Sequence, residues 1–298
     1  MSKILCYGSL NTDIVYSMPH FVRPGETLAA LGVARYPGGK GLNQSVALSR
    51  AGARVFHGGK IAADGEWLLG CLRDAGVDTS LVSAAGASTG TAVIQVTADG
   101  ENSIIINHGA NYEISSDEID RTLNCFGSGD LLVMQNEIND TARIIGKAAA
   151  RGMLAALNPS PIDDALLGMD LSGVTYLILN EIEGQSFTGC AAAEDILPAL
   201  AAKYPHLRIV LTLGSEGAVY YEAGKTFRQA AYKVRSVDTT AAGDTFTGYF
   251  LAAVMDGSDP QQALELAARA AAIAVTRKGA AASIPALGEV LAAKFDTD

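Results

Sequence analysis

The most informative stretch of the chain is Val237-Asp238-Thr239-Thr240-Ala241-Ala242-Gly243-Asp244-Thr245-Phe246-Thr247-Gly248. Three small residues, Ala241, Ala242 and Gly243, lie just ahead of a predicted helix that begins near Asp244. Small side chains let backbone N–H groups approach a phosphate closely, and a helix N-terminus adds unpaired donors and a partial positive charge. The stretch therefore predicts an anion hole for a transferred phosphoryl group, with Asp244 positioned to accept the proton of an attacking hydroxyl.

A purely structural interpretation of the same stretch is also open. Asp244 would then cap the helix, and the small residues would form a tight turn. Spacing within these twelve residues does not separate the two interpretations, so the rest of the chain has to decide between them.

Short apolar runs that end in a polar residue or glycine recur along the chain. They predict strands at 4–7, 131–134, 154–157, 176–179 and 209–213. Helical stretches such as 141–151 alternate with the later strands, and Ala-rich helices such as 260–276 would cover the faces of the sheet. Alternation of this kind is typical of an α/β fold, a doubly wound and mostly parallel sheet flanked by helices. In such sheets ligands bind beyond the carboxyl ends of the strands.

Four other segments have mixed or alternating polarity, which is typical of half-exposed strands. They lie at 13–17, 26–36, 91–97 and 103–107. We expect them to form a small lid sheet from about 12–36 and 90–107, inserted in a single domain of residues 1–298.

The amino-acid composition limits which kinds of molecule the protein can bind and where it can be located. The 298 residues include 22 basic and 32 acidic ones, a net charge of −10, and an acidic chain is a poor candidate for binding nucleic acid because phosphate neutralisation takes Lys and Arg. The cysteines contain no C-x-x-C pair, which favours reduced thiols. We find neither an apolar signal segment nor a stretch long enough to span a membrane, so we expect a soluble, cytoplasmic protein.

Six motifs of the chain resemble those of the ribokinase family, the phosphofructokinase-B type of sugar and nucleoside kinases, and they occur along the chain in the family's order. The resemblance covers residues 4 to about 285 and implies a ribokinase-like fold and an ATP-dependent sugar kinase. The motifs are the opening stretch (D-T-x-x-A/G-G-D), 7–13 (G-S-x-N-x-D), 38–44 (G-G-K-G-x-N-Q), 180–183 (N-x-x-E), 212–217 (T-L-G-x-x-G) and a cation loop at 274–283.

The resemblance implies two groups of ligand-binding residues. Those for the sugar are Asn11, Asp13, Gly39, Lys40, Asn43, Glu137 and Asp244. Those for ATP are Asn180, Thr212, Gly214, Ser215, Gly217 and Gly243, with Glu183 binding Mg²⁺ through water, as suits a strongly hydrated ion.

Each of these residues also has a plainer interpretation. The Asn11-x-Asp13 stretch fits a turn, the glycine run a loop and helix start, and 212–217 a hairpin turn. Glu137 fits a solvated or capping carboxylate, and Glu183 a carboxylate on a surface helix.

The resemblance also implies a monovalent cation, usually K⁺, that fixes the anion-hole loop without touching the substrate. The matching positions, most of which would act through backbone carbonyls, are Asp238, Thr240, Ala274, Arg277, Gly279 and Ser283. In relatives the exposed face of the lid pairs two subunits, so a homodimer is expected.

The sequence differs from the usual ribokinase pattern at three positions, and these differences bear on the choice of substrate rather than on the reaction. Asn136 stands where ribokinases often carry Leu, Leu42 is bulkier than the usual Ala, and Ala268 gives no contact to the adenine base. D-ribose, phosphorylated to ribose 5-phosphate, is the first expectation, and deoxyribose, another pentose, a hexose or a nucleoside remain alternatives.

Two other classes of protein stay open on the residues alone. A non-catalytic sugar-binding protein on the same fold is one, because fold does not dictate function. A nicotinamide enzyme is the other, although no G-x-G-x-x-G fingerprint follows a strand.

Overall fold

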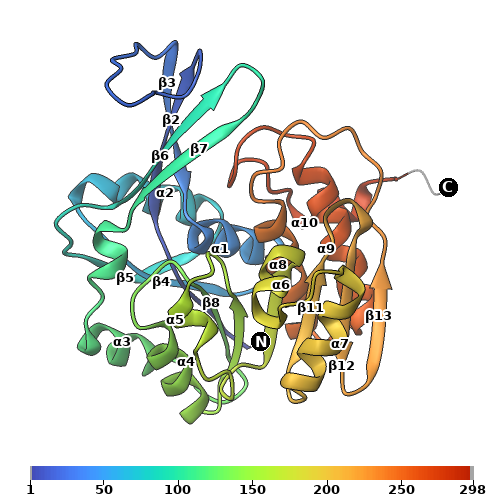
Figure 1. The fold of residues 1–298 in the computed structure, drawn as a ribbon. Helices are drawn as coiled ribbons and strands as arrows, with labels where there is room; N and C mark the ends of the chain where they lie inside the picture. The colour runs from blue at the N-terminus through green and yellow to red at the C-terminus, as the bar shows by residue number, and fades with distance from the viewer. Residues whose placement is uncertain (1, 296–298) are drawn as a thin grey trace.

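The computed structural model describes residues 2–295, which form a large sheet flanked by helices and a separate small sheet (Figure 1). The large sheet has nine strands in the order β13-β12-β11-β10-β9-β8-β1-β4-β5. Their bounds are β1 Ile4–Tyr7, β4 Val55–Ile61, β5 Asp78–Ala84, β8 Leu131–Gln135, β9 Leu154–Asn158, β10 Tyr176–Asn180, β11 Arg208–Thr212, β12 Ala218–Glu222 and β13 Lys225–Gln229.

The neighbouring strands from β5 to β11 are all parallel, which confirms the predicted doubly wound architecture. One edge differs from a purely parallel sheet, because β12 and β13 form an antiparallel hairpin there. The helices are α1 Lys40–Arg50, α2 Glu66–Asp74, α3 Ser116–Leu123, α4 Thr141–Ala150, α5 Asp164–Leu167, α6 Glu181–Thr188, α7 Ala193–Lys203, α8 Ala242–Met255, α9 Pro260–Ala274 and α10 Leu287–Ala292. Short 3₁₀ turns are η1 Ala63–Gly65, η2 Gly109–Tyr112 and η3 Gly214–Glu216.

Both faces of the large sheet are buried, which explains why its strands are almost continuously apolar. Alternate residues of β1 enter two separate cores. Ile4 and Cys6 pack on the side covered by α1, α8 and α9, and Leu5 and Tyr7 pack on the side of α3, α4 and α7. No helix between residues 2 and 295 is long and apolar enough to cross a membrane.

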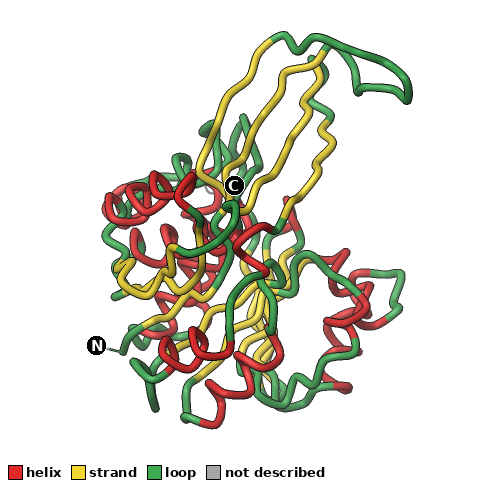
Figure 2. Tube along the Cα trace, turned by 90° about the vertical axis from the view of Figure 1, so that its left-hand side faces the viewer, coloured by secondary structure: helices red, strands yellow, loops and turns green. Residues whose placement is uncertain are grey.

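The small sheet projects from the body as a lid (Figure 2). Its strands run in the order β3-β2-β6-β7, with β2 Asn11–Met18, β3 Gly32–Gly38, β6 Gly90–Thr97 and β7 Asn102–Asn107. The prediction of a strand over 26–36 is wrong at its start. The ladder with β2 runs from Asn11–Gly38 to Ser17–Gly32, and the Leu31 N–H still donates to the Ser17 carbonyl at 2.8 Å. Strand β2 ends at Met18, so residues 26–30 have no strand to pair with.

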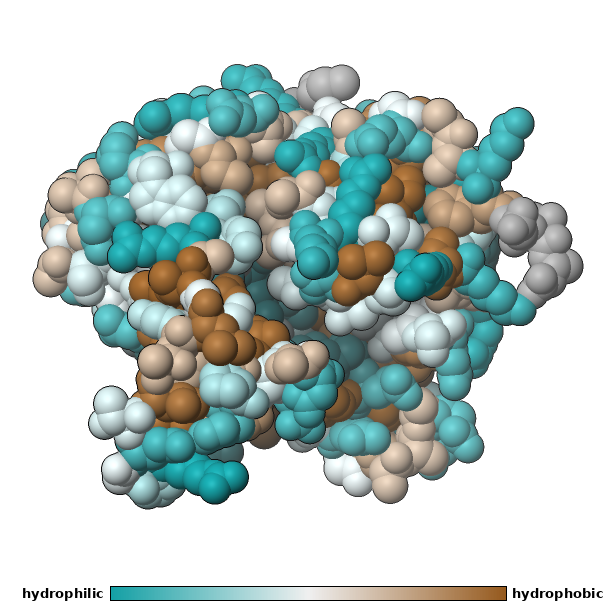
Figure 3. Space-filling view, turned by 90° about the horizontal axis from the view of Figure 1, so that it is seen from above, coloured by the Kyte–Doolittle hydropathy of each residue, from teal (hydrophilic) through white to brown (hydrophobic). Residues whose placement is uncertain are grey.

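Strand register divides the lid residues between two faces. Asp13 pairs with Ala92 and Tyr36, and Ala92 pairs with Ile106, so these four side chains share one face. Alternation along the strands puts their neighbours, Ile105 among them, on the opposite face. Figure 3, viewed from the end at which the small sheet projects, shows apolar side chains exposed there. The exposed large apolar residues within its strands are Val33, Tyr36, Ile104, Ile105 and Ile106.

Candidate active site

A cavity of about 180 Å³ opens at the carboxyl ends of β9, β10 and β11, beside the N-termini of α1 and α8. This is where an open α/β sheet binds ligands. Eight predicted site residues line it, namely Lys40, Asn180, Glu183, Thr212, Ala241, Ala242, Gly243 and Asp244. Asn158, Ser160, Ile178, Leu179, Thr239 and Thr247 complete the lining.

Helix α8 begins two residues earlier than the prediction near Asp244. Ala241 is the N-cap with φ 59°, so Ala242, Gly243 and Asp244 form the first turn rather than a loop ahead of it. The Ala242 N–H donates to the Thr239 carbonyl at 3.2 Å, whereas in the described chain the Gly243 and Asp244 amides have no acceptor. The cavity is therefore faced by two free amide donors at a helix N-terminus, where an anion is stabilised.

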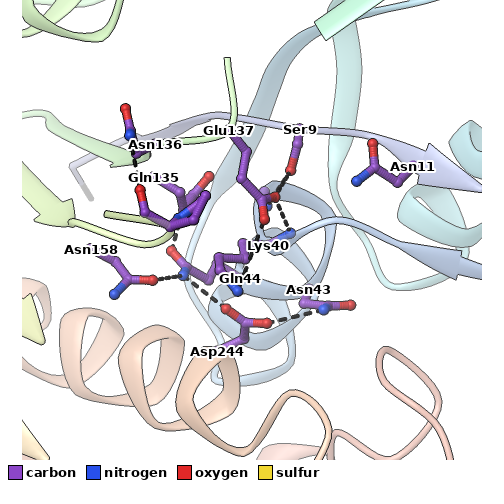
Figure 4. Close-up of polar contacts among 12 residues, drawn as sticks. Ser9, Asn11, Lys40, Asn43, Gln44, Gln135, Asn136, Glu137, Asn158 and Asp244 are labelled. Atoms are coloured by element: carbon purple, nitrogen blue, oxygen red, sulfur yellow. Dashed lines mark hydrogen bonds and ion pairs between the residues drawn. The ribbon is translucent and has the colours of Figure 1, made fainter. Parts of the chain in front are cut away.

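Asp244 is not a helix cap, so that interpretation was wrong. Its side chain makes no capping hydrogen bond to α8 and instead contacts α1 (Figure 4). Asn43 Nδ2 donates to Oδ2 at 3.0 Å, and Gln44 Nε2 donates to Oδ1 at 2.9 Å. Both carboxylate oxygens are thus held by amides at the edge of the anion hole.

The glycine run at 38–41 lets α1 approach the turn that follows β1. Gly39 has φ 92°, and a Cβ there would lie 3.0 Å from the Ser9 carbonyl oxygen and 3.2 Å from the Asn11 nitrogen. A side chain at Gly41 would collide with the backbone of Gly8 and Ser9. The contact brings together two motifs that are 30 residues apart in sequence.

Glu137 joins these motifs to β8. Its Oε2 accepts a hydrogen bond from the Lys40 backbone N–H at 2.9 Å and another from the Ser9 hydroxyl, and Lys40 Nζ lies 3.9 Å from its Oε1 (Figure 4). Only 13% of its side chain is exposed. The interpretation of Glu137 as a solvated carboxylate was therefore wrong.

Two charged groups of this cluster have shifted pKa values. Burial raises the pKa of Asp13 to about 7, helped by the negative charge of Glu137 and opposed by Lys40. Burial acts to lower the pKa of Lys40, but Asp244, Glu137, Glu183 and Asp13 outweigh it and the pKa is raised. Lys40 is thus a persistent cation among four carboxylates, and Asp13 can hold a proton near neutral pH.

Asn180 and Glu183, which the resemblance assigns to the nucleotide, form a reciprocal capping box at α6. Asn180 Oδ1 accepts from the Glu183 N–H, and Glu183 Oε2 accepts from the Asn180 N–H, both at 2.9 Å. Glu183 is only 9% exposed and lines the cavity, so it is not a surface carboxylate. Thr212 also lines the cavity, whereas Gly214, Ser215 and Gly217 lie in the turn that joins β11 to β12, the hairpin turn of the plainer interpretation.

Asp238 links the anion-hole loop to the predicted cation loop. Its Oδ1 accepts from the backbone and side chain of Thr240 at 2.9 and 2.6 Å, and its Oδ2 accepts from the Gly279 N–H at 2.9 Å. The Arg277 side chain pairs instead with Glu289 at 2.8 Å, and the Ser283 hydroxyl donates to the Ala280 carbonyl. Residues 2–295 contain no cluster of three or more His, Cys, Asp or Glu side chains that could hold a metal ion.

Several polar residues of the site are not among the predicted site residues. Gln44, Gln135 and Asn158 are linked by hydrogen bonds beneath Asp244, and Asn111 donates to Asn11 Oδ1 at 2.7 Å. Gln135 and Asn158 end β8 and β9, so polar residues at the ends of buried strands are the signal that could have identified them.

The three departures take no part in the cavity. Asn136 Nδ2 donates to the Pro161 carbonyl at 2.9 Å and to Asp163 Oδ2 at 3.0 Å, which holds the turn after β9. Leu42 and Ala268 are buried in the core beneath α1 and α9.

Known proteins resemble this chain in both sequence and fold. The family model described as pfkB family carbohydrate kinase matches residues 1–287. The chain is 34% identical over 296 residues to the ribokinase of Haemophilus influenzae, covering 95% of each chain, and 30% identical over 296 residues to the deoxyribokinase of Salmonella typhi, covering 95% of this chain and 96% of the other.

Two solved structures share the fold. The ribokinase of Cryptococcus neoformans in complex with ADP superposes with a TM-score of 0.87 at 35% identity, over 98% of this chain and 99% of the other. The ribokinase of Arabidopsis thaliana complexed with ribose and ATP gives a TM-score of 0.85 at 30% identity, over 97% of each chain.

Proposed function

Because this chain belongs to the pfkB family of carbohydrate kinases, we propose that it transfers the γ-phosphoryl group of ATP to the hydroxymethyl oxygen of D-ribose, giving ribose 5-phosphate and ADP. The observation that carries the proposal is the position of Asp244. Its carboxylate lies between the two free amides of α8 and the polar cluster of Asn43, Lys40 and Glu137. Similarity to the Arabidopsis thaliana ribokinase, which was solved in complex with ribose and ATP, supports the same assignment.

In this mechanism the sugar is held by hydrogen bonds before any bond is broken. Asn11, Asp13, Asn43 and Glu137 offer carboxylate and amide groups to its hydroxyls, and Gly39 lets the sugar approach the backbone. A hydroxyl buried without a partner costs about 1–3 kcal/mol, so a closed site of this kind selects its sugar by matching donors to acceptors.

Phosphoryl transfer needs a base and a place for negative charge. Asp244 takes the proton of the attacking hydroxyl, the hydroxyl oxygen bonds to the γ-phosphorus, and the bond to the bridging oxygen of ADP breaks. The Gly243 and Asp244 amides and the Lys40 ammonium then stabilise the charge on the transferring oxygens.

The residues present fit a hydrated Mg²⁺ on the nucleotide side, where ATP would be held by Asn180, Thr212, Gly214, Ser215, Gly217 and Gly243. Glu183 uses Oε2 in the capping box, and its Oε1 accepts no protein hydrogen bond in the described chain, which suits a water-mediated contact to the ion. Bound Mg²⁺ would neutralise phosphate charge.

The cation loop fits a monovalent ion such as K⁺. Carbonyl-rich segments at 238–240 and 274–283 already meet through Asp238, so an ion bound between them would stiffen the loop that carries the anion hole. Asp238, Thr240, Ala274, Arg277, Gly279 and Ser283 would surround it, mainly with backbone oxygens.

For the whole chain we propose one cytoplasmic kinase domain over residues 1–298 whose lid closes on the sugar. The face of the lid that carries Asp13 and Ile106 would cover the sugar and exclude water. The opposite face, which carries Ile105, would pair with a second copy of the chain as a homodimer.

A deoxyribose kinase is the second candidate, supported by the Salmonella typhi relative. Another pentose, a hexose or a nucleoside would need the same chemistry at the same base. These substrates differ in which hydroxyls they present to the polar cluster, so direct comparison of the sugars decides between them.

The test is a panel of pentoses, hexoses and nucleosides assayed for ADP release with Mg²⁺ and K⁺ present, with the product identified by mass spectrometry. D-ribose should give the highest kcat/KM, and sugar-independent ATP hydrolysis alone would refute the proposal. Asp244→Asn should lower kcat at least about a thousandfold, since it removes the base, while calorimetry still detects sugar binding. Unchanged turnover in this variant would exclude Asp244 as the base.

A further inference from the structure

The two amides that hold Asp244 differ in how completely their own hydrogen bonds are satisfied. Asn43 donates to Oδ2, but its own Oδ1 is buried without a partner in the described chain, and the residue is only 6% exposed. An unpaired buried acceptor favours any ligand that brings a donor. Asn43 is thus ready to exchange partners when a sugar hydroxyl arrives.

Gln44 has no such freedom. Its Nε2 donates both to Asp244 Oδ1 at 2.9 Å and to Asn158 Oδ1 at 3.1 Å, which uses both N–H groups. Its Oε1 accepts from Gln135 Nε2 at 2.7 Å. The Gln44 amide is fully satisfied and fully buried, so a bound sugar has nothing to offer it.

The partners of Gln44 are themselves anchored to the sheet. Gln135 is the last residue of β8, and Asn158, the last residue of β9, donates through Nδ2 to the Ile178 carbonyl in β10 at 3.0 Å. Three adjacent strands therefore fix the position of Gln44 and, through it, one oxygen of Asp244 (Figure 4).

We propose that Gln44 is a positioning residue that anchors Asp244 through Oδ1, while Asn43 releases Oδ2 to the sugar, so that Oδ2 is the oxygen that takes the proton. This inference rests on the proposed function. On sugar binding the Asn43 amide turns to the sugar, and the reacting O–H then faces a carboxylate oxygen that has lost its competing donor. The proton moves to Oδ2, and the hydroxyl oxygen attacks the γ-phosphorus as ADP leaves.

Gln44→Met tests the anchor, because it keeps the length of the side chain and removes its hydrogen bonds. We expect kcat to fall about tenfold to a hundredfold with the KM for sugar nearly unchanged, since the base is misplaced and the sugar contacts stay. Asn43→Leu should instead raise the KM for sugar, and exposed Gln262→Met on α9 is the matched control expected to change neither.

A second measurement separates the anchor from the proposed function. The charged and titratable groups around Asp244 are Lys40 and Glu183 in the cavity and Cys6 beneath it, and none is altered by these variants. The carbon-13 resonance of the Asp244 carboxyl can be measured without substrate and should broaden or shift in Gln44→Met, because the carboxylate loses the hydrogen bond that holds Oδ1. Should Gln44→Met unfold, Gln44→Glu keeps the shape and should displace the carboxylate by repulsion, with the same change in the resonance.

The outcomes are distinct. A wild type that phosphorylates no sugar refutes the proposed function and leaves the carbon-13 spectra to judge the anchor. An Asp244 carboxyl resonance that is the same in the wild type and both Gln44 variants overturns the anchor, and so does a Gln44→Met enzyme that loses sugar affinity but keeps kcat.

Discussion

At the scale of single residues, the site is governed by one lysine and four carboxylates. Lys40 lies among Asp13, Glu137, Glu183 and Asp244, and its positive charge offsets part of their mutual repulsion. The offset is incomplete at Asp13, where burial and Glu137 raise the pKa to about 7. A sugar hydroxyl can therefore meet either an acceptor or a donor at Asp13, depending on pH.

Asp13→Asn should change the pH dependence of stability. The unfolded carboxyl loses its proton near pH 4, while the folded one retains it to about pH 7, so ionisation of Asp13 destabilises the fold as pH rises through this window. The variant lacks this penalty. Without sugar it should gain on the order of 4 kcal/mol over the wild type between pH 4 and pH 8 in denaturant unfolding, since about three pKa units correspond to this free energy.

Asp99→Asn provides the control for this experiment. The pKa of Asp99 is lowered, first by the Thr97 hydroxyl, so its contribution is lost only as pH falls below about 4. Its unfolding curve should therefore follow the wild type between pH 5 and pH 8. An Asp13→Asn protein that also follows the wild type across this range would show that the carboxyl titrates normally.

At the scale of elements, helix α8 has two roles, one at its first turn and one in its middle. Its first turn supplies the free amides of Gly243 and Asp244, and its middle packs against α1 in the core. One glycine lies in each of these two parts of the helix, so substitutions there can test the two roles separately. A Cβ at Gly243 would meet no protein atom within 4 Å, whereas a Cβ at Gly248 would lie 2.8 Å from the Leu48 nitrogen.

Alanine at Gly243 should impair activity but not stability, whereas alanine at Gly248 should impair stability. Gly243→Ala should keep the melting temperature and lower kcat about tenfold or more, because its methyl group obstructs phosphate approach to the amides. Gly248→Ala should lower stability by about 1–3 kcal/mol through overpacking against α1. Thermal unfolding and steady-state kinetics check both, and a fully active Gly243→Ala enzyme would argue against an anion hole at this turn.

At the scale of the whole molecule, the lid has two exposed apolar faces and so two predicted uses. Ile105 and Ile106 are neighbours in β7, 61% and 45% exposed, and alternation directs them to opposite faces. Ile106 shares a face with Asp13, which belongs to the predicted sugar site. Ile105 lies on the face that we propose for the second subunit.

Substitution of these neighbours should separate assembly from sugar binding. Ile105→Ser should convert a dimer to a monomer in analytical ultracentrifugation with the sugar KM nearly unchanged. Ile106→Ser should raise the sugar KM several-fold and leave the molar mass alone, since each change removes apolar contact on one face only. A wild type that sediments as a monomer would contradict the proposed dimer.

Much of the fold could be predicted from local sequence. Continuous apolar runs such as those at 131–134 and 176–179 are strands buried on both faces, and each was predicted within a residue of its bounds. The strand over 26–36 was misplaced because its extent depends on where β2 ends, which local pattern does not encode. The start of α8 was misplaced because Ala241 adopts a left-handed conformation that the sequence gives no reason to expect of alanine.

For the site, residue order alone shows which side chains are available, namely small residues at a helix start, carboxylates and amides after strands, and a glycine run. Which of these side chains meet depends on how the whole chain packs. Asp244 lies about 200 residues from Asn43 and Gln44 along the chain, yet their side chains are in hydrogen-bond contact. Hydrogen bonds act over about 3 Å, and parallel strands with helical crossovers bring together residues from distant segments, so such partners are set by the packing of the sheet.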